Sequence, residues 1–340
     1  MRQESSSSSG DGGDGGDGGG DELVGPPTPE YDLVPNDLGG VPMPDGFGAS
    51  AAKEAALPSF RWPGAPVHVH DPIDLRLADK VHVQVDYRSG GAAPLRLARS
   101  YHSNASAYPA RVTMPIGTGW RTHYDRSLQV LSASLVRLHR ANGQTMDLSF
   151  NGSTWVSSLP VGVLTQIAGG WQYINHRDVT ETYDTTGRLS SLTDAGHVTT
   201  MQYDGSSRLI RVANPFGRAL DFAYDGAGRV ATVTLPGGST LGYTYGSSNN
   251  LIAIRFADNS TRQYAYEDAR FANALTGIVD ESGRRRLTWA YDTAGRPNYG
   301  TYGSGVNSVS VVYNGSQVTT TDARGTQRTR TSPPLRVARC

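Results

Sequence analysis

The second half of this 340-residue chain repeatedly alternates apolar residues with other residues over five positions. A period of two is typical of a strand with one buried face, because successive side chains of a strand point to opposite faces of its sheet. No segment of this region shows helical periodicity, so strands are predicted throughout it. The alternating positions include Leu220, Phe222 and Tyr224; Leu241, Tyr243 and Tyr245; Leu287, Trp289 and Tyr291; and Val309, Val311 and Tyr313.

A tyrosine ends each of these segments and opens a short motif, which reads YDTTGRL at its first occurrence and YDGAGRV at its third. Seven such motifs follow one another at separations of 20, 21, 21, 21, 25 and 22 residues. Near-constant spacing of this kind indicates a tandem array of one supersecondary unit. The seven tyrosines are Tyr183, Tyr203, Tyr224, Tyr245, Tyr266, Tyr291 and Tyr313.

The residues after each tyrosine predict a tight turn. In four motifs an aspartate follows directly, and its side chain can accept a hydrogen bond from the backbone N–H two residues further on. Glycine three residues after the aspartate supplies the positive φ that closes such a turn, and the next arginine is expected to pair with the aspartate. The motifs led by Tyr245 and Tyr266 lack the aspartate or the Gly-Arg pair, so their turns are expected to differ. The signature residues are Asp184, Gly187 and Arg188; Asp204; Asp225, Gly228 and Arg229; and Asp292, Gly295 and Arg296.

Each unit is therefore predicted as strand, turn, strand, turn. A two-stranded unit is marginal alone and needs neighbours to cover its apolar face. The units are expected to line up in one antiparallel sheet, with the tyrosines in cross-strand ladders as structural residues. The alternative is that tyrosines on an open face stack on sugar rings.

Composition divides the rest of the chain. Residues 1–62 are rich in Ser, Gly, Asp and Pro and are predicted to form a disordered leader. Residues 63–178 are predicted as an irregular β domain with Asn-Gly turns at Asn142 and Asn151. Residues 179–329 hold the repeats, and residues 330–340 continue none of them and are predicted as an irregular tail.

Charge and cysteine content exclude several classes of protein. The first 60 residues contain 11 acids and 2 bases, which leaves 20 acids and 29 bases for the rest. No groove-reading motif accompanies these bases, so nucleic-acid binding is not expected. The single cysteine, Cys340, excludes an intrachain disulfide. There is no apolar run of 18 residues and no visible secretory signal, so no membrane-spanning helix is predicted.

Candidate chemistry is sparse. His68 and His70 would lie on one side of a strand near His82, but a third ligand at fixed spacing is missing, so solvated histidines are favoured over a metal site. The sequence has no Gly-x-Ser-x-Gly elbow, no Cys/His pair for thiol catalysis and no phosphate-binding loop. We therefore predict no enzyme, no metal and no cofactor.

The Tyr-Asp…Gly-Arg-Leu unit of residues 183–329 resembles the YD repeat of the RHS and teneurin families. The preceding block resembles the N-terminal domain that comes before the shell in RHS proteins; the resemblance rests on Asp71–Asp74, Asp86-Tyr87, Arg99–Ser103 and Gly119-Trp120. The resemblance implies a spiralling antiparallel β-sheet that forms a hollow shell, which in bacterial members encloses a toxic C-terminal domain. It also implies a secreted or cell-surface location, with a downstream toxin domain or other RHS segments as partners.

These observations favour a non-enzymatic structural protein, the N-terminal part of an RHS-type β-shell. The family's signature near the end of the shell has no match, so a truncated member is expected. The alternative is a cell-surface module that binds carbohydrate or another cell. Because the array is expected to end in a strand with unpaired backbone groups, self-association through an edge bearing Val309, Val311 and Tyr313 is also predicted.

Overall fold

The computed structural model describes residues 68–69, 73–75, 77–104, 115–141, 145–157, 162–175, 177–303 and 305–331. All regular structure in these ranges is β-strand, which confirms the predicted all-β class. No helix of the described ranges is long and apolar enough to cross a membrane. The predicted leader and most of the predicted tail lie outside the described residues.

The first five strands form a small antiparallel sheet in the order β1-β2-β3-β4-β5. Its long strands, β3 and β4, pair from Val81–His102 to Arg88–Arg96, and Val81, Val83 and Val85 alternate along β3. The strands are β1 His68–Val69, β2 Ile73–Asp74, β3 Asp79–Arg88, β4 Arg96–His102 and β5 Trp120–Thr122.

The other 21 strands form one long antiparallel sheet in which each strand pairs with the next along the chain. An isolated bridge between Ser127 and Arg188 links the start of β6 to the residue before β13 and closes the first strands into a ring. The strands are β6 Ser127–Ser132, β7 Leu135–His139, β8 Thr145–Phe150, β9 Trp155–Val156, β10 Gly162–Ile167, β11 Gly170–Asn175, β12 Thr180–Asp184, β13 Leu189–Asp194, β14 His197–Tyr203, β15 Leu209–Ala213, β16 Ala219–Tyr224, β17 Val230–Thr234, β18 Thr240–Tyr245, β19 Leu251–Arg255, β20 Thr261–Ala265, β21 Gly277–Val279, β22 Arg285–Tyr291, β23 Pro297–Tyr302, β24 Val306–Asn314, β25 Gln317–Asp322 and β26 Gln327–Thr331.

One loop geometry recurs at both ends of the hairpins. In the turn from Asp225 to Arg229, the N–H of Asp225 donates to the Arg229 carbonyl and the N–H of Gly228 donates to the Asp225 carbonyl. Gly228 has φ of 78°, and Ser207 and Asn249 take the equivalent place with φ of 62° and 59°. This is the three-residue hairpin loop that ends in a left-handed residue. A non-glycine residue is therefore tolerated at this place, although at a cost in backbone strain.

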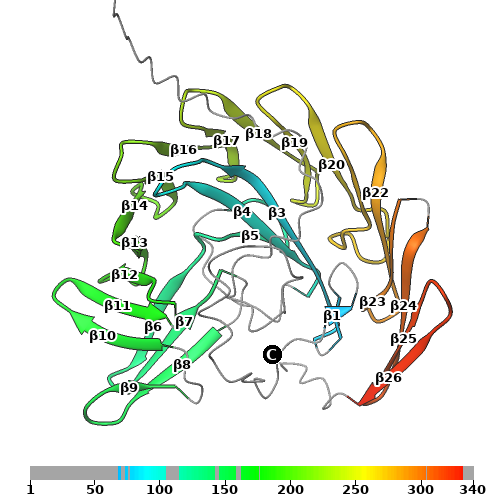
Figure 1. Ribbon diagram of the computed structural model, residues 1–340, viewed down its shortest axis with the longest axis horizontal. Coiled ribbons are helices and arrows are strands. Elements are labelled where there is room, and N and C mark those ends of the chain that lie inside the picture. Colours follow the sequence, from blue (N-terminus) through cyan, green and yellow to red (C-terminus); the bar gives the residue numbers. More distant parts are fainter. Residues whose placement is uncertain are drawn as a thin grey trace, which may run out of the picture.

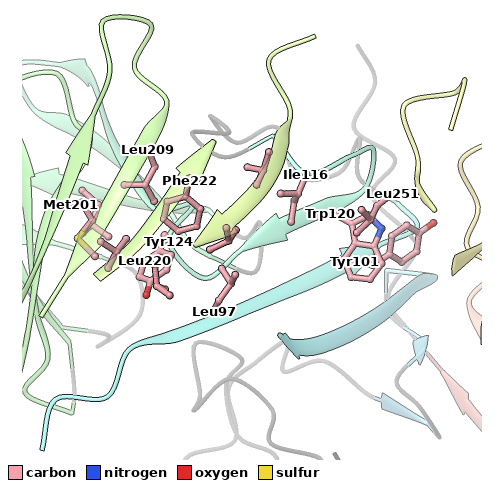
Figure 2. Close-up of a cluster of buried hydrophobic side chains, with 14 of the residues drawn as sticks. Leu97, Tyr101, Ile116, Trp120, Tyr124, Met201, Leu209, Leu220, Phe222 and Leu251 are labelled. Carbon is pink, nitrogen blue, oxygen red and sulfur yellow. The ribbon is translucent and has the colours of Figure 1, made fainter. Parts of the chain in front are cut away.

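The small sheet lies inside the curve of the long one (Figure 1). Leu97, Tyr101 and Trp120 from the small sheet belong to the same buried cluster as Leu220 and Phe222 from β16. Figure 2 shows Leu220 and Phe222 at one side of this cluster, Tyr101 and Trp120 beside Leu251 at the other, and Leu97 between them. The apolar faces of the repeats are therefore covered by the N-terminal strands as well as by neighbouring repeats.

The sequence analysis predicted the wrong position for the unpaired edge of the sheet. Val309 and Val311 lie in β24, where they are buried, and β24 is flanked by β23 and β25. Within the described residues the sheet instead ends on β26, which pairs with β25 and whose five residues are all exposed. The seventh unit was predicted to contain a second strand, which is β25, but the sequence analysis placed the edge on the strand before Tyr313. It did not predict the further strand β26, which follows no tyrosine motif although its threonines favour a strand. Strand β26 also includes residues 330 and 331, which had been assigned to the tail.

Candidate functional site

The signature residues form a joint between consecutive repeats. Within one turn, the Arg229 guanidinium donates to the Asp225 carboxylate (Nε to Oδ2, 2.9 Å), while Oδ1 accepts the backbone N–H groups of Ala227 and Arg229. The same ion pair joins Asp184 to Arg188, Asp204 to Arg208 and Asp292 to Arg296.

The arginine also contacts the next repeat. The Arg229 guanidinium lies 4.4 Å from the centroid of the Tyr245 ring, within range of a cation–π interaction. The Tyr245 hydroxyl in turn donates to the backbone carbonyl of Val230, the residue after that arginine, at 2.7 Å. The same pair of contacts links Arg188 with Tyr203, Arg208 with Tyr224, and Arg296 with Tyr313.

Burial and charge fix the ionisation of these groups. Burial raises the pKa of Tyr203, Tyr224 and Tyr245, so each hydroxyl remains a donor across the physiological range. At Asp204 the backbone N–H and then the side chain of Arg208 lower the pKa of the carboxyl, against a smaller opposing effect of desolvation. The joint is thus a chain of aspartate, arginine, tyrosine and backbone carbonyl that links one repeat to the next.

The irregular motifs depart from this pattern at Asn250 and Tyr266. Asn250 stands in the place of the arginine, and its side chain donates to the Ala272 carbonyl at 2.7 Å. The Tyr266 hydroxyl accepts from Trp120 Nε1 at 2.9 Å, a contact with the small sheet. The spacing of 25 residues accommodates an inserted loop, residues 267–276, between β20 and β21.

A buried ion pair lies where the small sheet meets the concave face of the repeats. Arg99 Nε on β4 donates to Asp86 Oδ2 on β3 at 2.7 Å, and both side chains are almost completely buried. Tyr243 on β18 donates to the same carboxylate oxygen at 3.0 Å, and the Tyr264 hydroxyl on β20 bonds to Arg99. The sequence analysis named Asp86 and Arg99 for the family resemblance and Tyr243 as a strand position. It did not predict that they meet, because Tyr243 and Tyr264 are more than 150 positions from their partners.

A second buried cluster anchors the first repeat. Glu181 on β12 is fully buried and accepts from Arg126 and from Arg140 at 2.5 to 2.7 Å. The Tyr183 hydroxyl donates to the same carboxylate, which explains why this first signature tyrosine has no bond to an earlier repeat. Two arginines around one carboxylate satisfy the buried charge and its lone pairs.

Of the three histidines considered as metal ligands, only His82 has a side chain that the structure describes. The described residues contain no group of three or more His, Cys, Asp or Glu side chains that could hold a metal. His82 is buried and lies against the rings of Trp120 and Trp289, at centroid distances of 6.3 and 5.8 Å. The side chain of His68 and all of His70 lie outside the described part of the chain.

Comparison with family models covers both parts of the chain. Residues 168–332 match the teneurin YD-shell, and residues 70–148 match a domain of unknown function, DUF6531. The first match spans the joints described above. Residues 168–332 of the chain belong to the RHS/YD-repeat family. No curated protein matches this YD-repeat chain.

Two solved structures similar to this YD-repeat protein are toxin complexes. The crystal structure of TcdB2-TccC3-TEV shares 12% sequence identity, with coverage of 77% of this chain and 20% of that chain and a TM-score of 0.29. The Photorhabdus luminescens Tc holotoxin pore with a TccC3 mutation shares 11%, with coverage of 76% and 20% and a TM-score of 0.21. This chain spans about a fifth of the length of these relatives.

Proposed function

We propose that this chain is a structural section of an RHS-type β-shell and does not catalyse a reaction. The observation that carries the proposal is the joint between repeats: aspartate, arginine and tyrosine are consumed in binding one unit to the next. In the full-length family context, the shell that this section helps to build would enclose a C-terminal toxin domain. The proposed partners are therefore the polypeptide downstream and other segments of the same shell.

The alternative of a carbohydrate-binding module requires aromatic faces that are open to a ligand. The signature tyrosines do not meet this requirement, because an arginine covers the ring of Tyr203, Tyr224, Tyr245 and Tyr313. Their hydroxyls are also bound to backbone carbonyls. A sugar could stack on these rings only if the joint opened.

Thermal unfolding and a glycan array, applied to the same variant, separate the two functions. Tyr245→Phe removes one hydroxyl and keeps the ring. If the tyrosine is structural, Tyr245→Phe loses about 1 kcal/mol of unfolding free energy with its buried hydrogen bond, and its melting temperature falls. Neither the native protein nor the variant should then show saturable glycan binding. Saturable binding by the native protein that is lost in Tyr245→Phe, with an unchanged melting temperature, would instead establish the binding module.

A further inference from the structure

The two irregular motifs are also the place where the small sheet is held. Six hydrogen bonds among the described residues join the segment 86–120 to the segment 243–275. Their acceptors and donors in the repeats are Tyr243, Asn249, Tyr264, Tyr266, Asn273 and Leu275. The departures from the repeat signature and the contacts with the small sheet therefore coincide.

The inserted loop provides part of this contact. The Tyr101 hydroxyl on β4 donates to the Asn273 carbonyl at 2.8 Å and accepts from the Leu275 N–H at 3.0 Å. Both backbone groups belong to the loop 267–276, which a repeat of ordinary length lacks. The extra residues thus supply a donor and an acceptor to one buried tyrosine of the small sheet.

The burial of position 250 explains why asparagine stands there in place of the signature arginine. It is 4% exposed, whereas the signature arginine side chains Arg188, Arg208, Arg229 and Arg296 are 23–36% exposed. An arginine at 250 would place its guanidinium beneath the inserted loop, with the partner aspartate replaced by Gly246. Burial of an unpaired charge is strongly unfavourable, so an arginine at 250 without its aspartate is incompatible with the docked loop.

A close backbone approach completes the contact. The Thr118 N–H donates to the Asn249 carbonyl at 2.8 Å. Gly117 precedes it with φ of +100°, and a Cβ at this residue would lie 2.8 Å from the backbone nitrogen of Leu251. Only glycine allows the close approach of the two loop backbones that this hydrogen bond requires.

We infer that the two irregular YD motifs and the loop 267–276 form a docking site dedicated to the small N-terminal sheet of the same chain. Asn250 and the inserted loop determine its specificity, and Gly117, Tyr101 and Trp120 are the docked groups. Three further hydrogen bonds reach earlier repeats, from Val230 to Pro115, from Asn214 to Ala93 and from Arg218 to Gly90. The docked sheet therefore connects repeats that do not touch one another and holds the curve of the long sheet.

Amide hydrogen exchange of the full chain tests the docking contact. Gly117→Ala should raise the exchange of the Thr118, Val230 and Leu275 amides by about tenfold or more, with β12–β14 unchanged. The control is Gly152→Ala, because Gly152 has a similar φ of +97° but no atom within 4 Å of an added Cβ. Equal exchange at the three amides in the two variants would overturn the proposal.

Two less disruptive variants test the same contact if Gly117→Ala fails to fold. Tyr101→Phe removes the hydroxyl that joins the two segments, and Tyr124→Phe removes an equally buried hydroxyl that donates to the Arg96 carbonyl within the N-terminal region. Faster exchange of the Leu275 amide is expected in Tyr101→Phe alone. The same rate in both variants would contradict the docking role.

A third pair tests whether the irregular sequence is required. Asn250→Arg restores the signature residue and should raise exchange at Thr118 and Leu275 in the same way as Gly117→Ala. Ser239→Arg introduces an arginine at the equivalent, exposed position of a turn outside the docking site, and no effect on these amides is expected. Unchanged exchange in Asn250→Arg would show that the missing arginine has no connection with docking.

Discussion

Arg229 binds two groups that belong to different repeats. Its guanidinium pairs with Asp225 in its own turn and lies over the Tyr245 ring of the next unit. One residue therefore stabilises the local loop and the contact between units, which explains why the aspartate, the arginine and the tyrosine recur together. The sequence analysis predicted the ion pair, but the stacking on the following tyrosine has no sequence signal beyond the constant spacing.

The signature carboxylates should make the protein sensitive to acid. The pKa of Asp204 is lowered in the folded state, chiefly by the backbone N–H and side chain of Arg208, so the folded protein binds this proton more weakly than the unfolded chain. The stabilisation is then complete above the unfolded pKa of about 4 and is lost as the pH falls through the lower folded value.

Urea denaturation between pH 2 and pH 6 measures this effect. Asp204→Asn should reduce the loss of unfolding free energy on acidification, and Asp194→Asn, outside the signature, serves as the control. An unchanged pH dependence in Asp204→Asn would contradict the assigned role of the carboxylate.

Two signature glycines with almost the same φ should respond differently to substitution. At Gly228 a Cβ would meet only the Arg208 side chain at 3.9 Å, so Gly228→Val should cost about 1–3 kcal/mol of backbone strain. At Gly187 a Cβ would lie 1.8 Å from the Leu128 carbonyl oxygen, because β6 crosses this turn. Gly187→Ala is therefore expected to destabilise more than Gly228→Ala. Equal unfolding free energies of the two alanine variants in urea would be inconsistent with the crossing of β6.

At the scale of elements, the strands before each tyrosine were predictable and the pairing of distant strands was not. The alternation of Leu220, Phe222 and Tyr224 gives β16, and the second strand predicted after the turn of this unit is β17. The position of β3–β5 against the repeats depends on contacts such as Arg99 with Tyr264, which no local pattern encodes. The division of the chain into the four predicted segments remains a prediction.

The edge strand β26 leads to a prediction about self-association. Arg328 and Arg330 pair with Thr320 and Val318 of β25 and so share the face on which these residues are buried. Charges on the buried face of an edge strand oppose pairing with another chain. Self-association should therefore increase with ionic strength, as the Debye length falls to about 3 Å at 1 M salt.

Sedimentation velocity at low and high salt tests the role of the edge. The double variant Arg328→Thr with Arg330→Thr should associate already at low salt, whereas Arg284→Thr with Arg286→Thr, which carries the same change of charge, should behave as the native protein. Association that is equal in both double variants would show that net charge, and not the edge, controls it.

At the scale of the whole molecule, the two sheets share one core. Trp120 of the small sheet and Trp289 of the long sheet belong to the same buried cluster, and Lys80 lies 4.2 Å from the Trp289 ring centroid. Repeat arrays held only by nearest neighbours can unfold in parts. The small sheet adds contacts between distant repeats, so we expect the described residues to unfold as one unit.

Equilibrium unfolding in urea, followed by two signals in one sample, tests this central claim most directly. Far-ultraviolet circular dichroism reports on the strands. Tryptophan fluorescence reports on the five tryptophans, two of which, Trp120 and Trp289, lie where the two sheets meet. Because both signals follow the same core, the account predicts coincident transitions with one midpoint. A fluorescence transition that is complete at lower urea, while the strand signal persists, would show that the small sheet is a separate module and would contradict the account.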